Sequence, residues 1–168
     1  MAGARVAGID FPGSVTVAGR TLRLNGAGVR TRFFVKVYAI GLYLERVTTD
    51  AAAVLAVDET RHVELRLLRS LSADDITSAI VTAVEQSAGD ALPTLRPRLD
   101  RLRTMFRPAA AGESISLDYV PGTGTTISAN GELLGTLEGK DLADVLLSVW
   151  IGPAPLDAGL KRALLGGA

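Results

Sequence analysis

The stretch from Arg32 to Leu44 constrains the fold most strongly, because β-branched and aromatic residues dominate it. Its apolar side chains stand at both odd and even positions, which is typical of a strand that is buried on both faces. Other segments of the chain alternate apolar with polar residues, and these predict strands with only one buried face. Arg32–Leu44 is therefore predicted to be a long strand with protein on both sides.

Shorter strands are predicted around this stretch, from their alternation and their flanking turn residues. Asn25–Gly28 is predicted to be a flexible corner, since glycine adopts backbone conformations that other residues avoid. Asn130-Gly131 is a strong signal for a tight hairpin. His62 falls on the polar side of its strand and is expected to be exposed. The predicted shorter strands are Ser14–Ala18, Thr21–Leu24, Arg61–Leu68, Ser114–Val120, Thr125–Ala129 and Glu132–Thr136.

Helices are predicted in two further parts of the chain. Ser72 is expected to cap the first helix, because acidic residues follow it where the helix dipole favours negative charge. Pro97 is expected in the first turn of a second helix. A third helix is predicted from the apolar stripe between Leu142 and Trp150, and a fourth over Asp157–Leu165.

The separation of strand runs from helix runs indicates an α+β domain. We expect a largely antiparallel sheet with the helices on one face, and between the two layers a place for an apolar ligand cleft. The length of 168 residues fits a single domain over residues 1–168. With 48% hydrophobic residues, the chain has ample apolar side chains for a core.

Charge balance and residue usage exclude several kinds of site. Since 18 basic residues offset 18 acidic ones, the chain lacks the basic footprint of a nucleic-acid-binding protein. It has no cysteine for thiol catalysis or a zinc–thiolate site, and one histidine cannot form a multi-histidine metal site. Its apolar stretches are shorter than the about 20 residues that span a membrane.

The basic residues between Arg96 and Arg107 form the one basic run of the chain. This run is expected to be a solvated helix face.

Several segments, taken in order, resemble the chalcone isomerase-like family. The resemblance runs from about Val6 to Leu165 and is strongest to bacterial members rather than to the plant flavonoid enzymes. It implies an open-faced β-sandwich, in which a layer of helices covers a large antiparallel sheet. The matching segments are Gly26–Arg30, Lys36–Leu44, Leu71–Asp74, Pro97–Asp100, Asp118–Thr126, Trp150–Gly152 and Leu160–Lys161.

This resemblance implies two functional classes. One is an isomerase that closes a chalcone ring; the other is a set of non-catalytic proteins in which an arginine and a tyrosine hold a fatty-acid carboxylate. The isomerase's guiding arginine corresponds to Arg30, and one of its threonines corresponds to Tyr38. Three further polar positions of the enzyme correspond to Ala73, Ile80 and Val149, whose side chains cannot do acid–base work. The resemblance thus implies no catalytic set and a ligand-binding pair, Arg30 and Tyr38.

Arg30 and Tyr38 suit a carboxylate on physical grounds as well. A carboxylate in an apolar cleft must be paired and hydrogen-bonded, and a guanidinium offers two parallel donors while a phenol adds a third. The two residues are eight positions apart, which is roughly 26 Å along a straight strand. They can share a ligand only if the chain turns between them, and we expect this turn around Thr31–Phe33.

We therefore expect a non-catalytic monomer, without a cofactor or metal, that binds a fatty acid or similar amphipathic carboxylate between sheet and helices. Two alternatives stay open. One is an isomerase or lyase acting on an enone such as a chalcone, with Arg30 as electrostatic stabiliser. The other is a structural or interaction domain with a closed core.

The sequence leaves the cellular compartment of the protein open. Met1–Val6 has no apolar signal segment. The protein is expected to be exported or periplasmic if a signal peptide was removed, and cytoplasmic otherwise.

Overall fold

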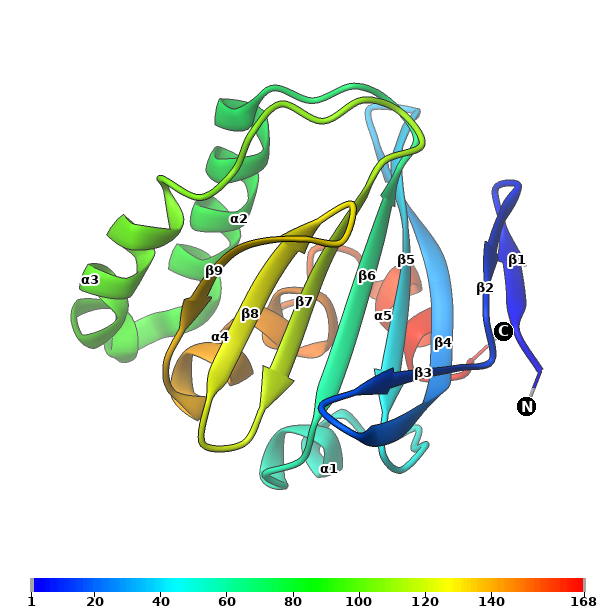
Figure 1. The fold of residues 1–168 in the computed structure, drawn as a ribbon, viewed down its shortest axis with the longest axis horizontal. Coiled ribbons are helices and arrows are strands. Elements are labelled where there is room, and N and C mark those ends of the chain that lie inside the picture. Colours follow the sequence, from blue (N-terminus) through cyan, green and yellow to red (C-terminus); the bar gives the residue numbers. More distant parts are fainter. Residues whose placement is uncertain (1, 168) are drawn as a thin grey trace.

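The fold is built on a curled antiparallel sheet in which each strand pairs with its neighbour in sequence (Figure 1). The computed structural model describes residues 2–167, and within them this sheet has seven strands. Two shorter strands, β1 (Ala4–Val6) and β2 (Ile9–Phe11), form a separate hairpin that the sequence analysis did not predict. The strands of the large sheet, in spatial order, are β3 (Ser14–Val17), β4 (Arg20–Arg32), β5 (Val35–Leu44), β6 (Arg61–Leu67), β7 (Ser114–Val120), β8 (Gly124–Ala129) and β9 (Glu132–Leu137).

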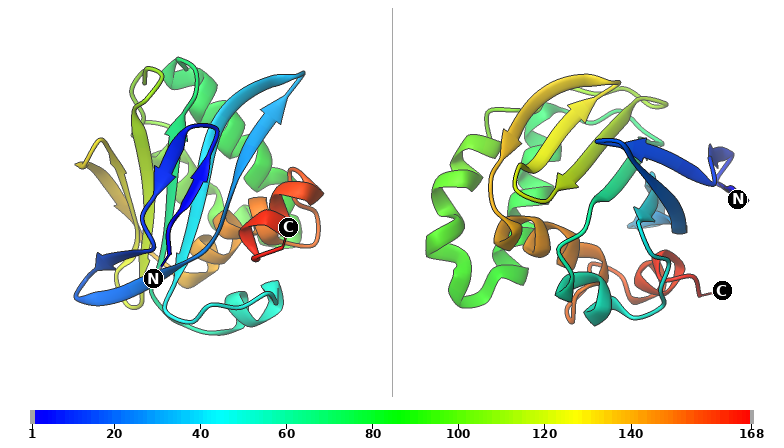
Figure 2. Two further views of the ribbon diagram at one scale, coloured as in Figure 1. Left: turned by 90° about the vertical axis from the view of Figure 1, so that its right-hand side faces the viewer. Right: turned by 60° about the horizontal axis from the view of Figure 1, so that its bottom comes forward.

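Helices cover one face of this sheet, which confirms the predicted α+β architecture (Figure 2). Helix α4 lies against the sheet, α2 packs beside α4, and α3 follows α2 through a short 3₁₀ turn. Helix α5 lies on β4, and α1 lies beyond the end of β5. Within residues 2–167, none of the helices has the length and apolarity to cross a bilayer. The helices are α1 (Ala51–Ala56), α2 (Ala73–Ala88), α3 (Leu92–Leu102), α4 (Lys140–Ile151) and α5 (Ala158–Leu164).

Strand β5 is covered on both faces along its second half, as its composition predicts. Ile40 and Leu42 are fully buried in the core shared with the helices. Gly41 lies on the opposite face, where a Cβ atom would come within 2.8 Å of the Phe11 ring. Tyr43, on the same face as Gly41, donates a hydrogen bond of 2.7 Å from its hydroxyl to the carbonyl of Pro12. The N-terminal segment therefore covers the face of β5 that points away from the helices.

The predicted cap of α2 is confirmed, whereas the predicted start of α3 is wrong. The Ser72 hydroxyl accepts from the Asp75 amide at 3.0 Å, and the Asp75 carboxylate accepts from the Ser72 amide at 3.1 Å. This is a capping box, which satisfies two otherwise unbonded amides. Helix α3 begins at Leu92 rather than near Pro97, because Pro93 takes the early position where a missing amide costs nothing. Pro97 lies inside the helix.

The turn between β4 and β5 consists of Phe33 and Phe34. The prediction of one strand from Arg32 to Leu44 was therefore wrong at its start, since β4 ends at Arg32 and β5 begins at Val35. Phe33 and Phe34 have φ angles of 51° and 64°. Positive φ at both central positions defines a type I′ turn, which asparagine and glycine normally occupy. Each bulky residue held there costs on the order of 1–3 kcal/mol.

The segment Asn25–Gly28 lies inside β4, which contradicts the predicted flexible corner. The strand carries a bulge here, between the pairs of Leu24 and Gly26 with β5. The buried Asn25 amide donates to the carbonyls of Thr48 (3.0 Å) and Leu164 (2.8 Å), and its oxygen accepts from the Thr48 amide at 2.8 Å. Asn25 thus joins β4 to the segment before α1 and to the end of α5.

The glycines of this segment permit close packing rather than flexibility. A Cβ atom on Gly26 would lie 2.1 Å from the carbonyl oxygen of Ala163. A Cβ atom on Gly28 would lie 2.6 Å from a terminal methyl of Leu160. Only residues without a side chain allow α5 to approach β4 so closely, since backbone carbonyls cannot move aside.

We predict that Gly26→Ala lowers the free energy of unfolding by about 1–3 kcal/mol, because the α5 backbone must shift away from β4. Gly28→Ala should cost less, since the Leu160 side chain can rotate away from the added methyl group. Chemical denaturation of both variants measures the difference. Equal losses would contradict a backbone origin of the Gly26 constraint.

Candidate functional site

The pairing of β4 with β5 places Arg30 directly opposite Tyr38. Residues directly opposite each other in an antiparallel pair share a face, with their Cβ atoms about 4.5–5.5 Å apart. Tyr38 has the parity of Ile40 and packs against the core beneath the helices. The turn that the spacing required occurs at Phe33-Phe34, slightly beyond the expected Thr31–Phe33, because Thr31 and Arg32 still pair with β5. The two predicted site residues are therefore neighbours on the helix-facing side of the sheet.

Helix α4 adds a third member, Trp150, which the sequence analysis had assigned only to the apolar stripe of a predicted helix. Its indole Nε1–H donates a 2.9 Å hydrogen bond to the Tyr38 hydroxyl oxygen. Burial raises the pKa of Tyr38, although the Trp150 hydrogen bond and the charge of Arg30 both lower it. The phenol is thus protonated at neutral pH, and its oxygen accepts from the indole while its own proton can be donated.

Arg30 approaches the connection between α4 and α5. Its Nη1 atom contacts the carbonyl oxygen of Leu156 at 3.5 Å, which is a long hydrogen bond. Within residues 2–167, no carboxylate lies within ion-pair distance of this guanidinium. Arg30 therefore presents most of its donors, half-buried, beside a phenol that can also donate. Such a cluster suits an anion.

The space behind this cluster is nearly filled by side chains. A cavity of about 20 Å³ lies between the sheet and α4, lined by Trp150, Arg61, Tyr119 and Thr125 among others. That volume holds about one water molecule, whereas ligand pockets usually measure about 300–1,000 Å³. Trp150 both lines this cavity and contacts Tyr38, so the indole separates the cavity from the Arg30–Tyr38 pair. The cavity between the sheet and α4 is therefore too small for a ligand in this conformation.

A larger cavity of about 260 Å³ lies at the opposite end of β5, between this strand and α1. Leu44, Val54, Val57 and Arg61 line it together with polar residues, of which Arg46 is exposed. Leu44 is six residues beyond Tyr38 along β5, which corresponds to roughly 20 Å. This cavity is therefore remote from the Arg30–Tyr38 pair.

The remaining family positions are apolar here. Ala73 is the first residue of α2, Ile80 is partly buried in the same helix, and Val149 is buried in α4. These side chains fill space and offer no hydrogen-bonding groups. The structure thus brings Arg30 and Tyr38 together. Ala73, Ile80 and Val149 add no polar group to this pair.

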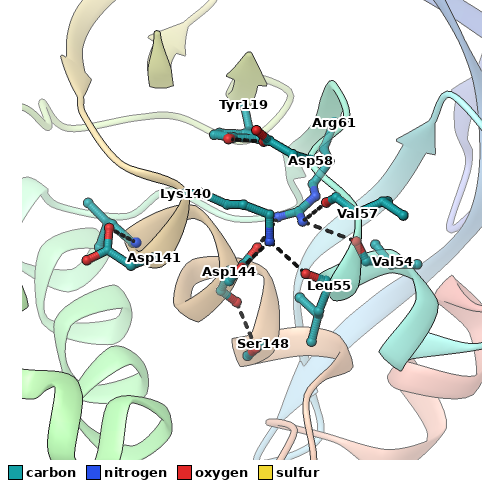
Figure 3. A network of polar contacts seen from close by, with 11 residues as sticks. Val54, Leu55, Val57, Asp58, Arg61, Tyr119, Lys140, Asp141, Asp144 and Ser148 are labelled. Carbon is teal, nitrogen blue, oxygen red and sulfur yellow. Dashed lines mark hydrogen bonds and ion pairs between the residues drawn. The ribbon is translucent and has the colours of Figure 1, made fainter. Parts of the chain in front are cut away.

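A second polar cluster ties α1, β6 and α4 together around Arg61 (Figure 3). Arg61 is 3% exposed, and its guanidinium donates to the carbonyls of Val54 and Val57 at the end of α1. Its Nη1 atom also lies 2.8 Å from the Asp144 carboxylate. Lys140 contacts the other oxygen of Asp144 at 2.6 Å and donates to a carbonyl of α1 at 2.7 Å. The Asp144 carboxylate thus pairs with both cations, so this cluster fits a structural role.

Across the sheet, His62 is buried rather than exposed, which contradicts the sequence prediction. Its Nδ1 atom pairs with the Asp118 carboxylate, its register partner on β7, and Nε2 lies 3.8 Å from Glu64. The ring also packs edge-on against Tyr43, with centroids 5.4 Å apart. Burial by itself lowers the pKa of His62, but the hydrogen bonds and charges of Asp118 and Glu64 outweigh it and raise the pKa to about 9.

The basic run between Arg96 and Arg107 is engaged in ion pairs, although its helix face is largely exposed as predicted. Arg98 makes a two-pronged contact with Asp141, at 2.7 and 2.8 Å, that joins α3 to the start of α4. Arg101 pairs with Glu138 at 2.8 Å. These pairs neutralise the run.

For the Arg61 cluster, we predict that Asp144→Asn lowers the free energy of unfolding by about 3 kcal/mol, because it leaves Arg61 buried without its counter-charge. The matched control is Glu132→Gln, which breaks an ion pair with Arg107 whose two side chains are both exposed. That control should cost less than about 1 kcal/mol. Denaturation measures both losses of unfolding free energy. Similar losses in the two variants would show that the buried Arg61–Asp144 pair stabilises the fold no more than an exposed pair does.

For His62, we predict a stability that declines at alkaline pH. The pKa of this histidine is higher in the folded protein, about 9, than its ordinary value of 6.5, which we take for the unfolded chain. Its stabilising contribution is therefore complete below about pH 6.5 and disappears as the pH rises through about 9. Denaturation at several pH values should show this decline in the wild type and not in His62→Gln. A flat wild-type profile between these values would be inconsistent with the raised pKa.

Comparisons with known proteins agree with this architecture. The structure is similar to the crystal structure of a fatty-acid binding protein of Arabidopsis thaliana, with a TM-score of 0.76 and 17% sequence identity. The similarity covers 98% of this chain and 96% of the other. A search of curated protein sequences gives no significant match. The family model described as chalcone isomerase-like matches residues 3–166. The chain therefore belongs to the chalcone isomerase-like family.

Proposed function

We propose that this protein is a non-catalytic family member that binds a fatty acid or a similar amphipathic carboxylate, with Arg30 and Tyr38 holding the headgroup. The observation that carries the proposal is the half-buried Arg30 guanidinium, which has no carboxylate partner within residues 2–167 and faces a phenol able to donate. The proposal includes the bacterial, non-flavonoid branch of the family and one domain over residues 1–168 that acts as a monomer. The name of the Arabidopsis thaliana structure adds support for this class of ligand.

The headgroup chemistry follows from the contacts. A carboxylate beside Arg30 gains a charge-assisted hydrogen bond from the guanidinium and a further one from the Tyr38 hydroxyl. The indole of Trp150 occupies an acceptor site of the phenol oxygen, so the phenol is oriented as a donor. These donors replace the water that a carboxylate loses on entering an apolar site, which would otherwise cost several kcal/mol.

In this proposal, room for the acyl tail requires the Trp150 side chain to move. Each buried methylene contributes roughly 0.8 kcal/mol, so an acyl chain gains most when it enters between sheet and α4. The existing cavity of about 20 Å³ holds no such chain, and Trp150 stands between it and Tyr38. In this proposal, binding moves the Trp150 side chain and joins the cavity to the space beside Tyr38.

A second candidate function, a structural or interaction domain with a closed core, is favoured by the small cavity volume. In that case Arg30 serves to hold the α4–α5 connection through the Leu156 carbonyl. The two candidates differ in a simple observable, since only the first predicts that the protein takes up a fatty acid. An isomerase would instead be revealed by turnover of a chalcone.

We predict that Arg30→Gln weakens binding of dodecanoate and hexadecanoate by about 10- to 100-fold, because hydrogen bonds to a charged group contribute about 1.5–3 kcal/mol. Tyr38→Phe should weaken it as well, since it removes the second donor while keeping the aromatic volume. Native mass spectrometry and calorimetric titration of the purified protein measure both effects. Trp150→Leu, which removes the indole that closes the cavity, should strengthen binding of the longer acid relative to the shorter one.

The matched control is Arg23→Gln, which removes an exposed cation from the same strand as Arg30. It should leave the affinity unchanged. If the wild type takes up neither acid, the fatty-acid-binding proposal is wrong. If Arg30→Gln binds as well as the wild type, the headgroup does not lie at this pair.

A further inference from the structure

The tip of the β4–β5 hairpin exposes three consecutive apolar side chains. Phe33 is 82% exposed, Phe34 is fully exposed, and Val35 is 41% exposed. Two other exposed large apolar residues, Val47 and Leu133, lie in other parts of the chain and not beside one another. A cluster of exposed apolar side chains marks a site of contact with another protein, a ligand or a membrane, whereas single exposed apolar residues need no explanation.

The backbone of the turn does not account for these phenylalanines. The β8–β9 hairpin of the same chain makes a tight turn, also with positive φ at both central positions, from Asn130 and Gly131. Those residue types adopt positive φ readily, whereas phenylalanine is strained there. The side chains of Phe33 and Phe34 thus contribute little buried apolar area to the fold, and they strain the turn. A contact outside the chain would explain their presence.

Cations surround the tip. Arg32 stands opposite Val35 and Lys36 stands opposite Thr31, immediately behind the turn. The Arg32 guanidinium lies 5.1 Å from the centre of the Phe33 ring. Within residues 2–167, neither Arg32 nor Lys36 has an acidic side chain at ion-pair distance, in contrast to the paired arginines of α3. The tip therefore combines aromatic side chains with uncompensated positive charge.

We propose that this hairpin tip docks on a membrane that contains anionic lipids, with Phe33 and Phe34 entering the boundary of the acyl chains and Arg32 and Lys36 contacting the headgroups. Aromatic side chains and cations together are the combination that binds such an interface. A two-residue turn projects a narrow, convex surface, whereas a stable protein interface needs about 800 Å² from each partner. The shape and the charge both favour the lipid surface over a protein partner.

This docking would place the Arg30–Tyr38 pair directly behind the membrane contact, because Arg30 lies two residues before the last residue of β4. The inference goes beyond the proposed function, and the docking itself does not depend on it. If both hold, an acid leaving the membrane would reach the site along the hairpin.

The test is sedimentation of the full chain with vesicles of phosphatidylcholine alone and of phosphatidylcholine mixed with phosphatidylglycerol. We expect the wild type to bind the anionic vesicles more strongly, and salt to weaken this binding. The double variant Phe33→Asn, Phe34→Gly creates the same turn chemistry as the β8–β9 hairpin and should fold. It should bind at least about tenfold more weakly, through loss of buried apolar area. Arg32→Gln and Lys36→Gln should each weaken binding about fivefold.

Leu133→Asn is the matched control, because it removes an exposed apolar side chain away from the tip and should leave vesicle binding unchanged. Equal binding of the double variant and the wild type, or no binding of the wild type, would overturn the proposal. A concentration-dependent dimer that the double variant abolishes would assign the tip to self-association and overturn it too. Fatty-acid uptake in solution, measured on the double variant, should match the wild type, which separates this test from that of the proposed function.

Discussion

The antiparallel pairing of β4 with β5 is the constraint on which the candidate site depends. Arg30 and Tyr38 are distant along the chain, and only the two-residue turn between Arg32 and Val35 makes them neighbours. A slip of one residue in this register would turn one of the two side chains to the opposite face. The strain at Phe33 and Phe34 is thus compensated by the long ladder of hydrogen bonds that follows on both strands.

Close packing on β4 and β5 positions the other components. The glycines of β4 let α5 approach the backbone, and the connection before α5 carries the carbonyl that Arg30 contacts. Helix α4 presents Trp150 to Tyr38 from above the sheet. The half-buried pair is therefore held by α4 and by the connection that follows it.

The buried charged side chains of this protein are compensated within the fold, whereas the half-buried Arg30 is not. Arg61 and His62 have carboxylate partners, Asp144 and Asp118, so their charges are compensated within the fold. Arg30 differs from both, since within residues 2–167 its contact is a single carbonyl. A compensated buried charge serves stability and an uncompensated one suits recognition, because the second can still gain a partner. This contrast distinguishes the candidate site from the structural clusters.

The sequence predicted the seven strands of the large sheet in outline, the start of α2, the approximate extents of α4 and α5 and the α+β class, because alternation, helical periodicity and the Ser72 cap are local signals. It did not predict the β1–β2 hairpin or α1. The prediction failed where contacts between distant parts of the chain determine the local structure. Phe33-Phe34 has no turn chemistry, the glycines near Asn25 serve α5 from the far end of the chain, and His62 is covered by residues from other strands. Arg30 and Tyr38 could be named from the sequence, but their partner Trp150 comes from α4, more than a hundred residues away. Only tertiary packing, which joins distant segments and expels water between them, could bring these three side chains together.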